Sequence, residues 1–359
     1  MSFTVEKRTA IIKYMLDKIR NRDRDFVKKT GENFDISETS VRRYIKECQQ
    51  KGVLLKDTGT AFGWKLSTQS GQWEFENDGY LEEDDVFRDR IAPFLKEVSP
   101  EAADIWYYAF AEIMNNAIEH SRGDRIRVSV QKDCLYTEIS IVDNGVGIFR
   151  NIQEYVREKL GARLSTEQAA LELYKGKLTT DPDAHSGEGI FLVSKMLDEF
   201  AVWSENTIYS YRCGDRDRFV QSHLVSYYTG LEGIGTMAVM KMDNESKRTS
   251  REVFDEFAPL EEGCVRTLIP VREMCTLSNP VARSEARRIL RRLDEFHEVI
   301  FDFQGIEFMG QGFADEVFRV FQNRHPEITL TAVNANASVQ GMIHHVRKGK
   351  VPPQNVPEK

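Results

Sequence analysis

The feature that most constrains this 359-residue chain is an acidic residue followed by two spaced glycines after a predicted strand. Residues 135–142 alternate apolar and polar side chains, as strands do, and Asp-Asn-Gly-Val-Gly follows at 143–147. A glycine has no Cβ, so another backbone or a ligand can approach it closely. A carboxylate at such a turn can accept a hydrogen bond from the exocyclic amine of a purine. The turn therefore predicts a nucleotide-base site built from Asp143, Gly145 and Gly147.

Two further motifs flank this turn in the sequence. Residues 104–120 have the apolar spacing of a helix, on which Glu112 and Asn116 stand four residues apart and share one face. An amide oxygen there can bind Mg²⁺, and a carboxylate can orient or deprotonate a water. Downstream, Gly187 and Gly189 stand in His-Ser-Gly-Glu-Gly, immediately before an apolar helix. A glycine-rich turn at a helix start predicts a phosphate site, because its backbone N–H groups are unpaired.

In this order and spacing, the three motifs resemble the GHKL family of ATP-binding domains over residues 90–245. In size the match is closest to the anti-sigma-factor serine kinases. The resemblance implies an α/β sandwich that binds ATP with Mg²⁺, with Glu112 as general base and Asn116 as the Mg²⁺ ligand. The other ATP contacts that it implies are Asp143, Gly145, Gly147, Gly187, Gly189 and, supporting the adenine site beside Asp143, Thr236.

The same resemblance implies an ATP lid at residues 150–184, a polar and helix-rich stretch. Lys175 and Lys177 lie within it. The sequence leaves two interpretations of these lysines open, because such side chains can reach phosphates or simply stay solvated.

A basic segment precedes the ATP-binding region. Residues 1–57 contain 14 lysines and arginines against nine acidic residues, a net charge of +5 in a chain whose formal charge is −8. Apolar spacing predicts three helices, the third capped by Ser37, and then a short hairpin with Gly59 and Gly63. Three helices and a hairpin resemble a winged helix-turn-helix.

This resemblance implies that the third helix enters a DNA major groove. Arg42, Arg43 and Lys46 would then contact phosphates or base edges. Winged helices also mediate protein contacts, so a helical interaction module with a merely solvated charged face is the alternative.

The C-terminal part of the chain alternates predicted strands and helices, which favours an α/β unit with a small mixed sheet. Residues 263–348 resemble a STAS-like domain, the fold of anti-sigma-factor antagonists, in which a serine after the central strand is phosphorylated. Gly310 stands near that position and has no hydroxyl, which argues against phosphorylation there. Gly310 and Gly312 precede a helix and can bind an anion or form a plain turn.

The predicted fold class is a multidomain α+β chain. Its predicted parts are a winged helix-turn-helix at 1–70, an acidic linker at 71–89, a GHKL α/β sandwich at 90–245, a STAS-like α/β domain at 263–348 and a disordered tail at 349–359. Five scattered cysteines without a CxxC pair favour neither a zinc site nor a disulfide framework. No apolar run reaches the roughly 20 residues that span a bilayer, so we expect a cytoplasmic protein without a membrane partner.

Three functions remain open. The first is a Mg–ATP-dependent regulator with slow hydrolysis, coupled through its flanking domains to DNA or to a regulatory protein. The second is an anti-sigma-type serine/threonine kinase, and the third is a nucleotide sensor without catalysis. A conventional sensor histidine kinase is disfavoured, because the first histidine is His120, inside the ATP-binding region. Many GHKL proteins dimerise, so a homodimer is one candidate assembly.

Overall fold

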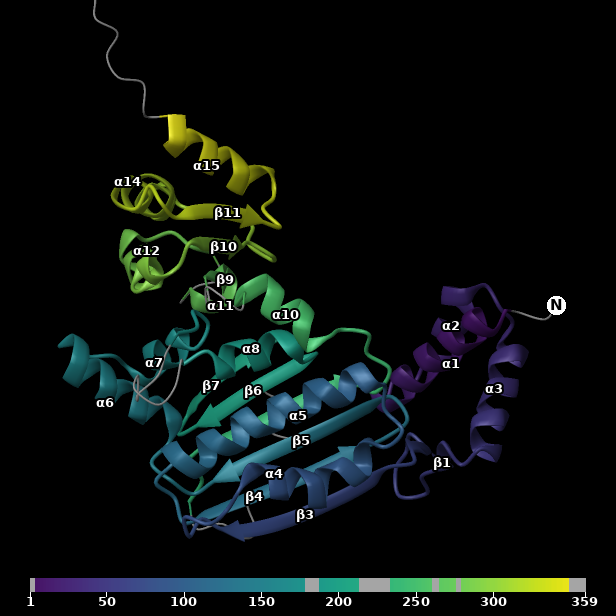
Figure 1. Cartoon of the computed structure of the whole chain (residues 1–359). Helices are drawn as coiled ribbons and strands as arrows, with labels where there is room; N and C mark the ends of the chain where they lie inside the picture. Colours follow the sequence, from purple (N-terminus) through teal and green to yellow (C-terminus); the bar gives the residue numbers. More distant parts are fainter. Residues whose placement is uncertain (1–3, 178–186, 213–232, 260–264, 276–278, 349–359) are drawn as a thin grey trace, which may run out of the picture. The chain divides into compact units, whose positions relative to one another are not determined.

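Two compact units make up the part of the chain that the computed structural model describes. The first combines residues up to 148 with residues 196–249, and the second combines 149–195 with the residues from 250 onward. Figure 1 shows both units in the colours of the sequence. The described residues are 4–177, 187–212, 233–259, 265–275 and 279–348, so the predicted disordered tail at 349–359 lies outside them. Within these ranges, no helix combines the length and the apolar character that crossing a bilayer requires.

The first unit begins with three helices and a hairpin, as the sequence predicts. The helices are α1 (Val5–Arg20), α2 (Phe26–Phe34) and α3 (Glu38–Gln50). Strands β1 (Leu54–Lys56) and β2 (Trp64–Leu66) then pair antiparallel.

Local sequence explains where these helices begin and which face they bury. Ser37 caps α3, because its side-chain oxygen accepts a hydrogen bond from the backbone N–H of Ser40 at 3.2 Å. The apolar stripe that follows is buried, and each such side chain contributes about 1.5–3 kcal/mol relative to exposure. The buried residues of α3 are Val41, Tyr44, Ile45 and Cys48.

A six-stranded sheet follows in the same unit, and every neighbouring pair of strands is antiparallel. In sheet order the strands are β3 (Gln69–Glu76), β4 (Arg125–Lys132), β5 (Tyr136–Asp143), β8 (Met237–Asp243), β6 (Glu199–Ser204) and β7 (Thr207–Tyr211). Strand β8, the last of these six strands in the sequence, lies between β5 and β6. This insertion brings the start of β8 to the end of β5, because Val142 pairs with Met237.

The predicted acidic linker at 71–89 is wrong. Most of it belongs to the edge strand β3 and to α4 (Glu83–Val86), with a π-helical turn from Phe87 to Ile91 and a 3₁₀ turn from Ala92 to Leu95. The acidic residues of β3 alternate with aromatic ones and meet basic residues across the strand pair. Arg127, for example, donates to Glu74 at 2.7 Å. Cross-strand pairing therefore neutralises part of the acidic charge of this segment.

Helix α5 (Pro100–Asn115) lies across the sheet (Figure 1). Ser99 caps it by accepting from the N–H of Ala102 at 3.2 Å, and Pro100 occupies the first helical position, where no N–H is needed. A π-helical turn, η3 (Asn116–His120), continues it. The uninterrupted helix predicted over 104–120 thus widens at Asn116.

The second unit contains the helices that follow the Asp-Asn-Gly-Val-Gly turn. They are α6 (Ile148–Leu160), α7 (Thr166–Glu172), α8 (Gly189–Met196) and α10 (Ser250–Phe257). The predicted helix-rich character of 150–184 holds for its described part. Helix α10 lies after the predicted GHKL domain, which ends at 245, and before the predicted STAS-like domain, which begins at 263. Its Phe257 packs against Phe191 of α8.

A three-stranded parallel sheet completes the second unit, in the order β11 (Thr329–Val333), β10 (Glu298–Asp302), β9 (Arg266–Pro270). The predicted mixed sheet is therefore wrong. Helical connections return the chain so that each strand runs in the same direction. These connections are α11 (Val271–Met274), α12 (Arg283–Leu290), η4 (Leu293–Glu295), α13 (Gln311–Asp315), the π turn η5 (Glu316–Phe321) and α14 (Gln322–Arg324), and α15 (Ala337–Lys348) follows the last strand.

Gly310 is packed too closely to carry a side chain. Its N–H donates to the carbonyl of Pro280 at 2.8 Å, and a Cβ there would lie 2.7 Å from the carbonyl oxygen of Val281. Of the two predicted roles for this position, the packing supports the turn. The same packing leaves no room for a serine side chain at this position.

We expect Gly310→Ser to lower the free energy of unfolding by about 1–3 kcal/mol, because the added atoms overpack against Val281. The urea midpoint of the full chain measures this. The matched control is Gly341→Ser, since a Cβ at Gly341 meets no atom within 4 Å. Equal midpoints for the two variants would contradict the assignment.

Candidate functional site

Asp143 is a buried carboxylate at the carboxyl end of β5, with 4% of its surface exposed. Its Oδ1 accepts hydrogen bonds from the backbone N–H groups of Gly145 at 2.8 Å and Thr236 at 3.2 Å. Burial raises the pKa of Asp143 to about 6, while these hydrogen bonds oppose the rise by favouring the charged form. The side chain is therefore a fixed acceptor that changes charge just below neutral pH.

Three glycines around this carboxylate leave no room for a Cβ. Gly147 has a φ of +90°, and a Cβ there would lie 2.5 Å from Ser204 Oγ. A Cβ at Gly145 would overlap the backbone of Ser121, and one at Gly235 would overlap Asp143 Oδ1. The sequence indicated Gly145 and Gly147, but it did not indicate that Gly235 packs on the same carboxylate.

Thr236 lies beside Asp143, where the sequence predicts it. Its Oγ1 accepts a hydrogen bond from the N–H of Ile148 at 3.0 Å, so it joins the start of α6 to the start of β8. Ser204, which is fully buried, donates to the carbonyl of Gly235 at 2.7 Å. Sequence reasoning missed Ser204, because the only local signal near it is the end of a predicted strand.

Glu112 and Asn116 stand where α5 becomes π-helical. The side-chain amide of Asn116 donates to the carbonyl of Glu112 at 2.7 Å, which turns the NH₂ group back along the helix. The Oδ1 of this amide is the atom that suits a cation. Single π turns inside helices are frequent at functional sites.

The loop after this π turn contacts the Asp143 turn. The carbonyl oxygen of Ser121 accepts a hydrogen bond from the N–H of Val146 at 2.9 Å. The Oγ of Ser121 accepts one from the N–H of Gly123, also at 2.9 Å. The turn η3 also contacts β5. The structure thus brings two of the three predicted motifs to one end of the six-stranded sheet.

The third motif belongs to the second unit. Gly187 has a φ of +73°, and Gly189 is the first residue of α8. His185 and Ser186, which complete the motif, lie outside the described residues. The phosphate contacts predicted for Gly187 and Gly189 remain predictions.

Lys175 is not a solvated lysine. Only 1% of its surface is exposed, and its ammonium donates to Glu172 Oε1 at 2.8 Å and to the carbonyl of Arg291 at 2.9 Å. The ammonium of Lys177 donates to the carbonyl of Glu295 at 2.9 Å. Both ammonium groups are thus already hydrogen-bonded to other parts of the protein. The sequence predicted either phosphate contacts or solvation, and not this arrangement.

The basic residues predicted to contact DNA lie on the exposed face of α3. Arg42 pairs with Glu38 at 3.3 Å, and Arg43 lies over the ring of Tyr44 at 5.4 Å. Lys46 is also exposed. An exposed ion pair of this kind contributes at most about 1 kcal/mol, so a phosphate can displace it at little cost.

Helix α1 contacts the sheet at the end opposite Asp143. Lys13 pairs with Asp243 at the end of β8, and Arg20 pairs with Glu138 and, at 2.9 Å, with Asp133. Leu135, in the turn between β4 and β5, joins the apolar core of the three helices.

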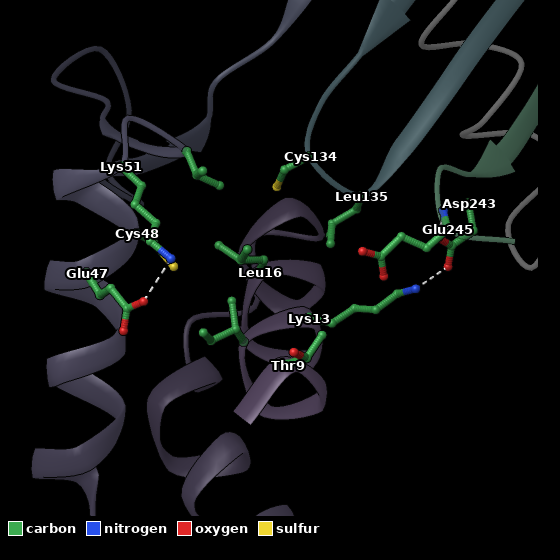
Figure 2. A pocket seen from close by; sticks show the side chains of 12 residues that line it. Thr9, Lys13, Leu16, Glu47, Cys48, Lys51, Cys134, Leu135, Asp243 and Glu245 are labelled. Carbon is green, nitrogen blue, oxygen red and sulfur yellow. Dashed lines mark hydrogen bonds and ion pairs between the residues drawn. The ribbon is translucent and has the colours of Figure 1, made fainter. Parts of the chain in front are cut away.

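A cavity of about 250 Å³ lies beside these contacts (Figure 2). Lys13 points toward Asp243 in this view, and the Glu47–Lys51 pair of α3 lies across from them. The sequence contains the complementary charges but not their pairing, since β8 follows α1 by more than 200 residues.

Comparison with protein-family models identifies two regions. Residues 85–209 match the histidine kinase-like ATPase domain, and residues 285–340 match a STAS-like domain of unknown function. The chain contains both domains. The resemblances to a GHKL ATP-binding domain and to a STAS-like domain are confirmed at the matched residues, and the first match supports ATP binding. No curated protein matches the chain, and the winged-helix resemblance remains a prediction.

The raised pKa of Asp143 predicts pH-dependent binding of the base. Adenosine is the appropriate probe because it has no phosphate to titrate. If only the carboxylate form accepts the adenine amine, the Kd for adenosine rises about tenfold between pH 7 and pH 5. Calorimetry or ligand-observed NMR measures it.

The control is Asp143→Asn, which presents an NH₂ group either to the adenine amine or to the N–H groups of Gly145 and Thr236. We expect it to bind adenosine at least tenfold more weakly at pH 7 and to show no pH dependence. A wild-type affinity that stays constant from pH 7 to pH 5 would rule out this role of Asp143.

Proposed function

We propose that the chain is a Mg–ATP-dependent switch that hydrolyses ATP slowly and passes its nucleotide state to the flanking domains. The observation that carries this proposal is the position of β5 and β8. Asp143 and Thr236 stand at one end of these two strands, and the contacts with α1 stand at the other.

The two strands form a short and stiff connection between these ends. An eight-residue strand is about 24 Å long from first residue to last. At its far end, the ring of Tyr136 lies under the guanidinium of Arg20, 5.1 Å from ring centre to Cζ, and Tyr136 is paired with Asp243 in the register. Ligand contacts that shift the Asp143 turn would therefore shift α1 as well, and through α1 they would move the exposed face of α3.

The residues present fit the proposed nucleotide. The carboxylate of Asp143 accepts from the adenine amine, and the glycines at 145, 147 and 235 let the backbone pack closely around that carboxylate. Glu112 either takes the proton of an attacking water in hydrolysis or accepts the proton of a substrate hydroxyl in phosphoryl transfer.

Among the described residues, no group of three or more His, Cys, Asp and Glu side chains could hold a metal ion. The one protein ligand proposed for Mg²⁺ is the neutral amide oxygen of Asn116, and the phosphates of ATP would supply the other oxygens. When bound, Mg²⁺ supplies neutralisation of the phosphate charge.

The decisive experiment follows γ-labelled ATP in the presence of Mg²⁺ with wild type and Glu112→Ala side by side. We expect wild type to release free phosphate slowly and the variant to lose at least a hundredfold in rate, because the general base is missing. Label retained on protein, in the presence of candidate antagonist proteins, would instead favour a kinase. Tight ATP binding with neither product would contradict the proposed hydrolysis and favour a nucleotide sensor.

The coupling to DNA has its own test. The double variant Arg42→Ala, Arg43→Ala should bind random-sequence duplex DNA more weakly and lower the slope of log Kd against log salt by about two, because two phosphate contacts are lost. Fluorescence anisotropy over a salt series measures both quantities.

The control for this test is Arg157→Ala, which removes an exposed arginine of α6. Equal affinity and equal salt slope for the control and the double variant would exclude DNA binding by α3. That outcome would favour the alternative, a helical interaction module that contacts a protein.

A further inference from the structure

A buried ion cluster joins Glu172, Lys175 and Arg292. Lys175 donates to one oxygen of the Glu172 carboxylate at 2.8 Å, and Arg292 donates to the other at 3.1 Å. The side chains are 4%, 1% and 11% exposed, respectively. Two cations thus share one carboxylate away from solvent.

Backbone carbonyls satisfy the remaining donors of the two cations. The ammonium of Lys175 also donates to the carbonyls of Arg288 at 3.3 Å and Arg291 at 2.9 Å, which uses all three of its protons. Arg292 donates in addition to the carbonyl of Lys177. Apart from the Glu172–Lys175 pair itself, these contacts link residues 172–177 to the end of α12 and the residues that follow it.

Two more hydrogen bonds reinforce this link. The hydroxyl of Thr267 on β9 donates to the carbonyl of Lys175 at 2.8 Å, and the ammonium of Lys177 donates to the carbonyl of Glu295. Removing one charged partner would leave buried polar groups with fewer bonds, so the contacts support one another.

The cluster connects the two regions that the family models separate. Glu172 and Lys175 lie inside the ATPase match at 85–209, whereas Arg292 lies inside the STAS-like match at 285–340. In the sequence, residues 172–177 also lie between Gly147 and Gly187, two glycines of the proposed ATP site. The STAS-like domain therefore holds the middle of the chain segment that connects two ATP-binding motifs.

We propose that the STAS-like domain pre-organises the ATP site by holding residues 172–177 through Arg292, so that Arg292 is a positioning residue for ATP retention. This inference rests on the proposed ATP binding. Because residues 172–177 are already anchored, they lose less conformational entropy when ATP binds, and the bound state is correspondingly favoured. By linkage, ATP in turn stabilises the anchored state, and a partner that displaces Arg292 would release ATP.

The test compares Arg292→Met with Arg291→Met in the full chain. Arg291 is the neighbouring arginine, but it is exposed and its backbone carbonyl is what the cluster uses, so its substitution leaves the cluster intact. The probe is a fluorescent ATP analogue with Mg²⁺, chased by excess ATP in a stopped-flow instrument. We expect dissociation from Arg292→Met to be at least tenfold faster than from wild type, Arg291→Met to match wild type, and Arg292→Lys to fall between them.

Hydrogen exchange without nucleotide provides the second readout. Amides of residues 172–177 should exchange at least tenfold faster in Arg292→Met than in Arg291→Met. Faster exchange with an unchanged or slower ATP dissociation rate would overturn the proposal, and unchanged exchange would overturn the anchor itself. If Arg292→Met does not fold, Lys177→Met removes the bond to Glu295 and the contact of the ammonium with the Phe296 ring, and it should show the same two changes at smaller size.

Failure of the underlying proposed function would look different. Wild type would then not bind the analogue at all, while Arg292→Met would still exchange faster at residues 172–177. That result would leave a structural anchor and remove its proposed role in ATP retention.

Discussion

The buried carboxylate of Asp143 is the interaction on which the rest of the first unit depends. Its Oδ1 joins the turn after β5 to the start of β8, two segments that are more than 90 residues apart in sequence. Raising its pKa from 3.8 to about 6 costs about 3 kcal/mol of stability above pH 6. This cost disappears below the unfolded pKa, because the folded state then carries the proton it prefers. A carboxylate kept charged at that cost is typical of a functional site.

The second unit also depends on buried charge, but there the charges are paired. Glu172 neutralises part of the charge of Lys175 and Arg292, and backbone carbonyls bind the remaining donors. The burial of Lys175 lowers its pKa, and the adjacent carboxylate opposes that shift. A buried ion cluster is weak evidence of net stability, but breaking it by removing one partner is strongly destabilising. This cluster explains why residues 149–195, matched to the ATPase family, pack with the C-terminal domain.

Local patterns account for most of the elements and for the chemistry of the site. The cap at Ser37, the alternation that ends at Asp143 and the spacing of Glu112 and Asn116 each involve only a few neighbouring residues. The order of elements, the two domain resemblances and the acid–glycine turn were therefore predictable. The linker at 71–89 and the mixed sheet were wrong, because strand β3 and the direction of β9 are decided by partners distant in sequence.

The sequence by itself determined which residue types could bind a nucleotide, because that capacity depends on chemistry and short spacing. Only the tertiary structure decided that Gly235 packs on Asp143, that Gly310 has no space for a hydroxyl group and that Lys175 is buried against Arg291. Each of these depends on a contact between segments more than 25 residues apart. Such contacts come from strand pairing and from the burial of charge, and a local pattern contains neither.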